Sequence, residues 1–594
     1  MKRVVTIGSL SNEKLVSYDE VQEKIMRQTL EALWFEGILS CDRTDRTWKT
    51  CGISSGGQPV IYSCEAEEKY SFGRIKIVKG SLKREGAPCT DLHLFLEELV
   101  LNHLDGPQVP SFIHELLETL AKDYQSRLVI PDCIPDQDRH YDALESHMTD
   151  GHPYHPSYKS RLGFSLEDNQ TYGPEFNQKI HLYWVAVKEE LMDTALSTGY
   201  TEEELYGQHL TEKDRQRFTR ILEQEGDGSK YVLIPVHPWQ WERKLGAVFT
   251  HQRINRQLIP LGTSESPYRA QQSIRSLSNR KRNDASYIKL SLSITNTSTS
   301  RILAHHTTQN APRISDWLDD LIRQDEFLQR EQFHILKEVM GVSFRYEEMS
   351  TVQYQSAYGT LGAIWRENIS TYLLEREDAW PLNALMLVQK NNEPFIRKVI
   401  DQHGIKRWSE ALIQTLVRPI IHLLYSHGIA LESHAQNIIL VLEDGLPKRM
   451  IIKDLHDSVR YVPNTLLYPQ LAPNLHPEPE THRKFNRYSF IHAAHVSEVR
   501  DYTYDAFFFI CMTELALTLE HFGLPEQEFW RQCAATIDQY QKEHPEYRER
   551  FEWFDLFSEE ALIEEMTKRR IYGDSELFFR KVANPLRRAR EGLL

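Results

Sequence analysis

Hydrophobic residues recur along the chain with two different periods, and each period predicts a different secondary structure. Three segments in the first part of the chain follow the helical period: 18–39, 92–102 and 112–124. Residues 48–78 instead alternate over short stretches that Gly56 and Gly57 divide, so we expect short strands there. The first part, 1–150, therefore mixes helix and strand.

A central part, 151–405, contains strand-like segments, whereas the last part, 406–594, is mostly helical in pattern. Four segments of the last part follow the helical period: 407–427, 504–522, 526–543 and 559–568. An irregular stretch, 463–479, interrupts them. The chain has 594 residues, and single cores stop growing near ~250–300 residues, so we expect two or three packed sub-domains of α+β class.

Composition and charge narrow the classes to which the protein can belong. The chain is 40% hydrophobic and 26% charged, and no apolar run approaches the ~18–20 residues of a membrane helix. The apolar stretch within residues 1–8 is too short for a signal peptide, so we expect a cytoplasmic protein without membrane contact. The net charge of -15 disfavours nucleic-acid binding. It suits a cationic partner such as a polyamine, although solubility alone is the simpler explanation.

The cysteines offer no sign of a metal or iron–sulfur site. They are Cys41, Cys51, Cys64, Cys89, Cys133, Cys511 and Cys533. Their number is odd, their spacings are wide, and no C-x-x-C pair occurs. We expect reduced thiols of structural importance only.

The segment 287–295 is the most informative for chemistry. Its apolar and polar residues alternate with period two, which predicts a strand with one apolar face and one face carrying Lys289 and a row of hydroxyls. An ordinary half-exposed strand gives the same pattern. The segment that follows, 296–301, contains Thr297 and ends in a second cation, Arg301, which favours the binding of anions.

A third cation precedes this strand. Arg275 lies between two hydroxyl residues, Ser273 and Ser276. Arginine, lysine and hydroxyl groups brought to one face suit phosphates or carboxylates, because each is a hydrogen-bond donor to anionic oxygen.

The proline-containing segment 151–164 forms a second group of candidate residues. Its prolines predict an extended or turning chain, on which Lys159 and Arg161 share one face. His152 and His155 suggest a metal site, but no third ligand has a suitable spacing. Anion binding by histidine, lysine and arginine together is the better functional interpretation, and a structural histidine is the simpler alternative.

A polar turn, 236–242, follows the apolar stretch 231–235 and contains His237 and Gln240 between two tryptophans. A strand that runs into a polar turn is a common place for site residues. The two tryptophans fit a hydrophobic core equally well, so His237 is as easily structural as ligand-binding.

Residues 438–454 predict a β-hairpin, since two apolar strands flank a turn that contains Gly445. Four polar residues precede the first strand: Glu432, His434, Gln436 and Asn437. Asp454 follows the second strand. An amide and a carboxylate at the open end of one hairpin can hold Mg²⁺ against ATP phosphates, as Asn and Asp do in protein kinases. A merely polar hairpin base is the alternative, but five converging polar groups disfavour it.

Taken together, these segments resemble the aerobactin synthetase (IucA/IucC) family, the siderophore synthetases that act independently of nonribosomal peptide synthetases. The matching motifs lie in the family's order between about 150 and 460: Gly151-His-Pro-x-His-Pro-x-x-Lys-x-Arg-x-Gly-Phe164, His237-Pro-Trp-Gln240, Lys289 with Thr297 and Arg301, Glu432-x-His-x-Gln-Asn437, and Lys453-Asp454. The helical last part looks like the family's ferric-reductase-like region, without a cysteine motif.

The resemblance implies a cupped-hand architecture of fingers, palm and thumb, with a kinase-like ATP-binding hairpin in the palm. It also implies adenylation of a citrate-type carboxylate with ATP and Mg²⁺, followed by attack of an amine or hydroxyl. A polyamine or diamine is the expected acceptor. Dimers are common among such enzymes, so a homodimer fits as well.

The resemblance also assigns roles to individual residues. It implies that the ATP site includes Ser273, Arg275, Ser276, Lys289, Gln436, Asn437 and Asp454, with Asn437 and Asp454 at the metal. It implies that the substrate carboxylates meet His155, Lys159, Arg161, Thr297, Arg301, Glu432 and His434. Catalysis then depends on His155, Lys289, Arg301 and His434. Ser276 stands where threonine is expected, and Lys453 stands where arginine is more usual, which puts the role of that cation in doubt.

Two other functions use some of the same residues. A small-molecule kinase with the same hairpin would release ADP, but the catalytic-loop Asp expected shortly before Asn437 is absent. A non-catalytic ferric-siderophore binding protein leaves the ATP-type residues unexplained. The sequence does not separate free citrate from a citryl monoamide as the substrate.

Overall fold

The N-terminal part of the computed structural model has the mixed character predicted for it. The structure describes residues 12–297, 299–484, 490–573 and 576–593; residues 1–8, where we expect no signal peptide, and Ser298 lie outside them. The predicted helices are present: α1 (Asn12–Phe35), α2 (Leu92–Leu96), which continues as a π-helix to Leu101, and α3 (Val109–Arg127). The predicted strands are β2 (Thr47–Ile53), β3 (Pro59–Glu68) and β4 (Ile75–Ile77).

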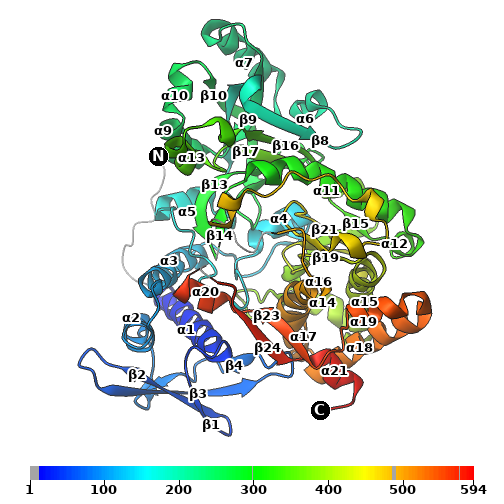
Figure 1. The fold of residues 1–594 in the computed structure, drawn as a ribbon. Coiled ribbons are helices and arrows are strands. Elements are labelled where there is room, and N and C mark those ends of the chain that lie inside the picture. The colour runs from blue at the N-terminus through cyan, green and yellow to red at the C-terminus, as the bar shows by residue number, and fades with distance from the viewer. Residues whose placement is uncertain (1–11, 298, 485–489, 574–575, 594) are drawn as a thin grey trace.

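The central part is built on a curled eight-stranded sheet. In spatial order its strands are β8 (Met192–Leu196), β16 (Glu338–Phe344), β17 (Gly362–Arg366), β12 (Tyr287–Leu290), β11 (Ser276–Asn279), β10 (Leu258–Ala270), β7 (Ile180–Lys188) and β9 (Tyr231–Val236). Neighbouring strands are antiparallel throughout. Helix α11 (His305–Gln324) packs against β16. Figure 1 shows this layer in green and teal in the upper half of the molecule.

The strand predicted over 287–295 is in fact two strands. It breaks at Ser291 into β12, which lies inside the large sheet, and β13 (Leu292–Asn296), which pairs with β14 (Thr299–Arg301). The Ser291 hydroxyl donates to the carbonyl oxygen of Gly359 and accepts from the backbone N–H of Leu303, so tertiary contacts end the first strand there. Both faces of β12 are buried, which excludes an ordinary half-exposed strand.

The predicted hairpin is confirmed in the last part of the chain. Strands β20 (Ile438–Glu443) and β21 (Leu446–Ile452) pair antiparallel in a sheet ordered β15 (His334–Ile335), β21, β20, β18 (Glu377–Pro381). Their turn places Asp444 and Gly445 at φ 51° and 83°, a backbone conformation that suits glycine. Asn437 and Lys453 face each other at the open end, where the Lys453 N–H donates to the Asn437 carbonyl oxygen.

Most of the predicted C-terminal helices are present. They are α15 (Ile405–His422) with a π-helical end over Leu423–His427, the π-helical Tyr504–Met512 with α17 (Thr513–Glu520), and α18 (Glu526–Glu543). The structure adds two helices that were not predicted, α16 (Val496–Thr503) and α21 (Pro585–Arg590). The helix predicted over 559–568 is wrong. Residues Glu560–Glu564 form strand β23, which pairs with β24 (Phe579–Ala583), and helix α20 begins only at Met566 and ends at Tyr572. Ala561 and Ile563 alternate into the core, so the burial follows the strand period.

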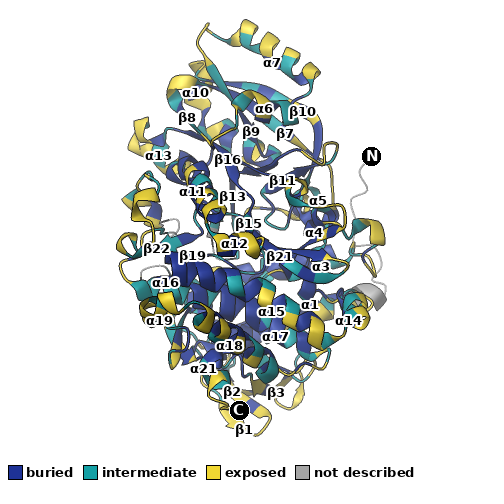
Figure 2. Ribbon diagram, turned by 90° about the vertical axis from the view of Figure 1, so that its right-hand side faces the viewer, coloured by how far each residue is buried: buried dark blue, intermediate teal, exposed yellow. Residues whose placement is uncertain are grey.

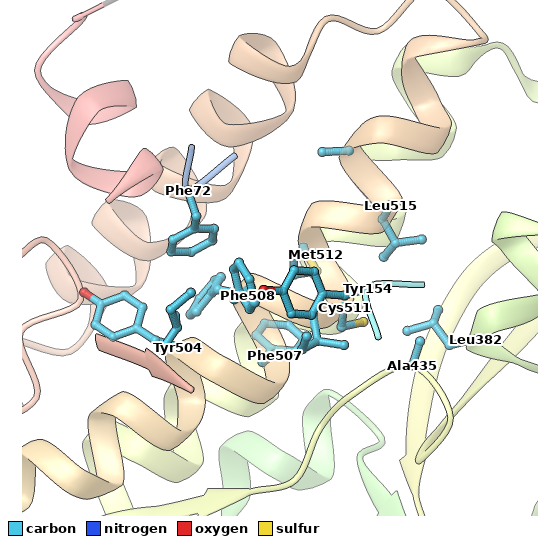
Figure 3. Packing of buried hydrophobic residues seen from close by; sticks show 14 of the residues in the cluster. Phe72, Tyr154, Leu382, Ala435, Tyr504, Phe507, Phe508, Cys511, Met512 and Leu515 are labelled. Carbon is cyan, nitrogen blue, oxygen red and sulfur yellow. The ribbon is translucent and has the colours of Figure 1, made fainter. Parts of the chain in front are cut away.

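The hydrophobic core has two main bodies. One gathers residues of the large sheet, from Ile180 to Trp365. The other joins the N-terminal part directly to the last part of the chain: Phe35 stacks on Phe509 at 5.6 Å, and Phe72 meets Trp530 edge-on at 5.4 Å. Figure 3 shows Phe72 and Tyr154 packed among residues 504–515. The N- and C-terminal parts therefore share one core.

Burial is most continuous through the centre of the molecule. Figure 2 shows strands β19 (Ile429–Leu431) and β21 in dark blue, with exposed residues on α7 (Glu212–Glu225) at one end and β1 (Asp42–Thr44) at the other. Within the described ranges, no helix is both long and apolar enough to cross a bilayer. All seven cysteines are free thiols.

We predict that Gly341→Ala destabilises the protein strongly, because α11 approaches β16 with no space for a side chain. A Cβ atom at Gly341 would lie 1.8 Å from the carbonyl oxygen of Thr308. We expect a loss of about 3 kcal/mol or more in the free energy of unfolding, the upper end for overpacked sites. The measurement is chemical denaturation. Gly56→Ala is the control, because its Cβ would meet only the Ser54 hydroxyl at 4.0 Å; equal stability of the two variants would contradict this account.

Candidate active site

A buried ion cluster joins the large sheet to the hairpin. The Lys289 ammonium, on β12, lies 3.2 Å from a carboxylate oxygen of Asp454, which follows β21. The same oxygen accepts a hydrogen bond of 2.5 Å from Arg366, at the end of β17. The cluster continues to His456, whose Nε2 lies 3.2 Å from the Lys289 ammonium and whose Nδ1 lies 2.6 Å from a Glu338 oxygen. Sequence reasoning thus placed Lys289 and Asp454 correctly as neighbours.

Burial and mutual attraction set the charges in this cluster. Burial lowers the pKa of Lys289 to about 8, against the attraction of Asp454. Burial alone would raise the pKa of Asp454, but Lys289 and Arg366 hold it well below the ordinary value. Asp454 also has φ 63°, a left-handed conformation that is uncommon for residues other than glycine and often marks functional sites. The carboxylate is therefore ionised and held in a strained position.

Two arginines predicted for anion binding, Arg275 and Arg301, lie close enough for Arg275 to act on the pKa of Lys289 and for Asp454 to act on that of Arg301. The Arg275 guanidinium donates to the carbonyl oxygens of Arg301 and Ile302, each at 2.7 Å, and so ties the 273–276 loop to the end of β14. Burial lowers the pKa of Arg275 to about 10, and it also lowers that of Arg301. Within the described ranges, the Nε of Arg301 and the hydroxyl of Ser276 are buried without a hydrogen-bond partner. Buried donors without a partner indicate a place for an anionic ligand.

The loop 273–276 and the turn 297 have defined local structure. The Ser273 hydroxyl accepts a hydrogen bond of 3.1 Å from the Ser276 N–H, and Ser276 pairs with Lys289 across β11 and β12. Thr297 is half-buried in the turn between β13 and β14 and has φ 61°. Gln240 holds β13 in place, because its amide both donates to the Ser293 hydroxyl and accepts from the Ser293 N–H.

The polar box before the hairpin is open to solvent. The side chains of Glu432 and His434 are 40% and 27% exposed, and their nearest oxygen and nitrogen lie 3.9 Å apart. The Glu432 carboxylate accepts a hydrogen bond of 2.8 Å from the Ser458 hydroxyl. Its negative charge also acts to raise the pKa of Arg301, so the polar box lies near that arginine. Asn437 is buried, and its Nδ2 donates to the Glu432 carbonyl oxygen at 3.0 Å. Gln436 is half-buried beside it.

The two histidines of segment 151–164 differ in their surroundings. His155 is fully buried; its Nδ1 accepts from the Ser157 N–H at 3.2 Å, and its Nε2 has no partner. Burial lowers its pKa well below the ordinary value, as do the nearby charges of His152 and Arg570. The pKa of His152 falls to about 3 through burial and the proximity of His434, Arg74 and Arg301. His152, which the sequence suggested only as part of a metal or anion site, is thus within electrostatic range of His434 and Arg301.

The charged groups of Lys159 and Arg161 pair with carboxylates away from this centre, although the Arg161 backbone N–H donates to the Asn296 side chain at 3.3 Å, beside Thr297. Lys159 pairs with Asp123 at 2.7 Å and with Glu175 at 3.0 Å, while Arg161 pairs with Glu175 at 2.8 Å. All four side chains are buried. His237 is buried and its Nδ1 accepts a hydrogen bond from the Trp239 N–H, while its Nε2 has no partner among the described residues, so its role stays open. Lys453 points to Glu145 and to the Tyr141 hydroxyl at 2.7 Å, which accounts for a lysine at that position.

Sequence reasoning missed three members of the ion cluster: Arg366, His456 and Glu338. Arg366 directly follows the apolar run 362–365, and His456 lies two residues after Asp454. Their positions at a strand end and just after the hairpin were weak indications of a site residue. Glu338 begins a fully buried strand and is recognisable only from the fold.

One other cluster in the described part of the chain has metal-like spacing. Asp325, His422 and His427 place their ligand atoms within 4.8 Å of one another. The Nε2 atoms of both histidines already lie 2.9 and 2.8 Å from the same Asp325 oxygen, so the carboxylate is hydrogen-bonded by both rings. This arrangement links the end of α11 to α15 and to the π-helical segment that follows it.

Comparison with known proteins matches two family models to the chain. Residues 140–387 match the IucA / IucC family, and residues 406–577 match the ferric iron reductase FhuF-like transporter family. The first range contains Lys289, Arg301 and Arg366, and the second contains Glu432, His434 and Asp454.

Two curated relatives align with nearly the whole chain. The 2-[(L-alanin-3-ylcarbamoyl)methyl]-3-(2-aminoethylcarbamoyl)-2-hydroxypropanoate synthase of Staphylococcus aureus is 37% identical over 96% of this chain and 93% of the relative. The citryl-spermidine/3,4-dihydroxybenzoyl-citryl-spermidine:spermidine ligase of Bacillus anthracis is 35% identical over 97% of this chain and 94% of the relative.

Two solved structures have the same fold as this chain. The petrobactin biosynthesis protein AsbB of Bacillus anthracis superposes with a TM-score of 0.88 at 33% identity, covering 98% of this chain and 99% of that one. ATP-bound aerobactin synthetase IucA of Klebsiella pneumoniae shares the fold, with a TM-score of 0.72 at 17% identity and coverage of 95% and 99%. The motifs, the fold and the relatives lead to the same conclusion: the chain belongs to the IucA/IucC family of siderophore synthetases.

Proposed function

We propose that this enzyme adenylates a carboxylate of citrate or of a citryl monoamide and condenses it with a polyamine or diamine. The chain is a ligase of siderophore biosynthesis that joins a carboxylate to an amine. The observation that carries the chemistry is the buried Lys289 with the half-buried Arg275 and Arg301 beside the ionised Asp454. Among the described residues, the Arg301 Nε and the Ser276 hydroxyl have no hydrogen-bond partner.

In the first step a carboxylate oxygen attacks the α-phosphorus of ATP. The bond from phosphorus to the β-phosphate oxygen breaks, and pyrophosphate leaves with the electron pair. Both reactants are anionic, so their approach requires screening by fixed positive charge. We assign Lys289, Arg275 and the hydroxyls of Ser273 and Ser276 to the phosphates. Lys289 is buried at 7% side-chain exposure, where its charge acts with little competition from water.

We assign the substrate carboxylates to Arg301, Thr297, His434 and His155, and we add His152 because it neighbours Arg301 and His434. Glu432 lies at the open edge of this group and suits the incoming amine better than a carboxylate. We assign Lys159 and Arg161 an indirect role, in which they hold the segment 151–164 in its fold beside the substrate. Their charged groups form ion pairs with Asp123 and Glu175.

The residues present fit a magnesium ion. Asp454 is ionised and 16% exposed, and Asn437 uses its Nδ2 within the box, which leaves its Oδ1 to act as a ligand. Both supply the hard oxygen atoms that Mg²⁺ prefers. When bound, the ion would neutralise phosphate charge. Gln436 completes this side of the proposed nucleotide site, and the ATP-bound relative of the same fold supports ATP as the nucleotide.

In the second step the neutral amine attacks the acyl carbon of the adenylate. A C–N bond forms, the C–O bond to AMP breaks, and AMP leaves with the electron pair. The proton lost by the amine passes to a base, for which His434 and Glu432 are the accessible candidates. The names of the two curated relatives contain a spermidine and a 2-aminoethylcarbamoyl group, which supports a polyamine or diamine acceptor here.

The architecture we propose is a cupped hand. Residues 1–150 contribute to fingers and thumb, 151–405 form the ATP- and carboxylate-binding region, and 406–594 complete the palm with the kinase-like hairpin. We further propose a cytoplasmic enzyme that forms a homodimer.

We predict that the enzyme releases AMP and pyrophosphate in a citrate- and magnesium-dependent reaction, and that hydroxylamine traps the activated citrate as a hydroxamate. Product analysis with spermidine, a diamine, serine and ethanolamine as acceptors should give an amide with the first two. Release of ADP would identify a small-molecule kinase, and binding of a ferric siderophore without nucleotide turnover would identify a binding protein.

We predict that Lys289→Ala and Arg301→Ala each lower turnover by about 10²–10³-fold without loss of the fold, the cost of removing one charge-stabilising donor. Steady-state rates and thermal unfolding are measured together. Lys281→Ala removes an exposed cation from the loop between β11 and β12 and should be nearly silent. If Lys289→Ala and Lys281→Ala have equal activity, the buried cluster is structural only.

We predict that Asp454→Asn weakens ATP use and magnesium dependence together. The variant removes a hard-oxygen ligand and leaves Lys289 and Arg366 buried without their shared carboxylate. KM for ATP and the magnesium concentration for half-maximal rate should both rise. A change confined to the KM of the acceptor amine would contradict the assignment of Asp454.

A further inference from the structure

A second polar cluster adjoins the ion cluster at the N-terminal end of α11. It brings together three parts of the chain: Asp457 from the loop after β21, His306 from α11, and Glu478 and His482 from the segment 463–484, which we call the strap. Figure 1 shows the strap, in yellow, running along α11. Asn310 of α11 holds it there by exchanging two hydrogen bonds with the backbone of His476.

Two buried ring nitrogens in this cluster have no hydrogen-bond partner. They are His306 Nδ1 and His482 Nε2, in residues that are only 6% and 4% exposed. The two rings meet edge to face with centroids 4.6 Å apart, and His482 Nδ1 contacts the Tyr358 hydroxyl at 3.0 Å. The negative charge of Asp457 acts to raise the pKa of both rings. Burial nevertheless lowers both pKa values, to about 4 for His306, so both rings are neutral.

The carboxylates of the cluster are only partly compensated: Arg483 attracts Glu478, and the Thr307 hydroxyl and the nearby histidines stabilise Asp457. Asp457 accepts one hydrogen bond, of 3.1 Å, from the Thr307 hydroxyl. Over the described residues, neither Asp457 nor Glu478 forms an ion pair with a lysine or arginine within 4 Å. Burial and the charge of Asp457 raise the pKa of Glu478 to about 7. A cation bound here would relieve this repulsion.

The cluster is contiguous with the proposed reaction centre. Asp457 follows Asp454 by three residues, which span at most about 10 Å of extended chain. Both carboxylates act on the pKa of Arg275, and His456 between them contacts the Lys289 ammonium. An amine whose attacking end reaches the adenylate beside Lys289 can therefore extend its other end toward Asp457.

We propose that the Asp457–His306–Glu478–His482 cluster binds the distal ammonium of the acceptor, and so selects diamines and polyamines over monoamines. The inference rests on the proposed function and assigns its acceptor subsite. An alkylammonium group has three N–H donors and no acceptor, so it needs carboxylate oxygens and neutral ring nitrogens around it. This cluster offers both, and part of that hydrogen-bonding capacity is unused within the protein.

The experiment compares two acceptors of equal chain length, a diamine and the corresponding monoamine, in the wild type and in Asp457→Asn and His482→Gln. In the wild type the KM for the diamine should be lower than that for the monoamine by roughly 10- to 100-fold, as expected for one charge-assisted interaction. In both variants this ratio should fall toward one. Hydroxamate formation with hydroxylamine, which has no distal ammonium, should stay at the wild-type rate.

Asp193→Asn is the matched control. Asp193 pairs with His305, the neighbour of His306 at the same helix end, and with Arg345, so the variant removes one negative charge nearby without touching the cluster. It should keep the wild-type ratio of KM values.

Two results would overturn the inference. One is an unchanged KM ratio in folded Asp457→Asn and His482→Gln; the other is an equal loss with Asp193→Asn, which would reduce the effect to general electrostatic attraction. If thermal unfolding shows that Asp457→Asn is not folded, the KM ratio of His482→Gln decides the question. Absence of hydroxamate in the wild type with both citrate and a citryl monoamide would instead refute the proposed function, so the two failures are distinguishable.

Discussion

The site depends on charge compensation around one buried carboxylate. Burial of an unpaired charge costs several kcal/mol, so Asp454, Lys289 and Arg366 are stable in place only together. The two cations belong to neighbouring strands of the large sheet, β12 and β17, whereas Asp454 leaves the hairpin of another sheet. Their pairing therefore fixes how the two sheets meet. The unpartnered donors of Ser276 and Arg301 lie around this junction, where an anionic substrate can complete their hydrogen bonds.

Much of this could be predicted from sequence because it depends on local patterns. The hairpin followed from two apolar runs about a glycine turn, and its open end necessarily brings Asn437 opposite Lys453, next to Asp454. The position of Lys289 on a strand followed from alternation. The family resemblance then placed these motifs in one site, a step that spacing alone does not provide.

The remainder depends on tertiary contacts that leave no local pattern. Lys159 and Arg161 are of the same residue types as the site cations. Their charges, however, are paired with Asp123 and Glu175, which lie on other elements. The strand break at Ser291 depends on Gly359 and Leu303. The acidic stretch at 560–564 looks helical, yet pairing with β24 makes it a strand. In each case a partner on another element decides the outcome.

The core shared by the two ends of the chain has a consequence for biosynthesis. Helix α1 emerges early from the ribosome, but Phe35 finds its partner Phe509 only after most of the remaining chain has been made. Domains that fold as they emerge need their contacts within the finished part. The large sheet, whose core lies within residues 180–365, meets that condition, whereas the N-terminal part does not. Strands β2 and β3 can pack early against nearby helices, since Trp48 meets Trp34 and Tyr62 meets Phe95, but the face of α1 that carries Phe35 stays uncovered until the C-terminal helices have been made.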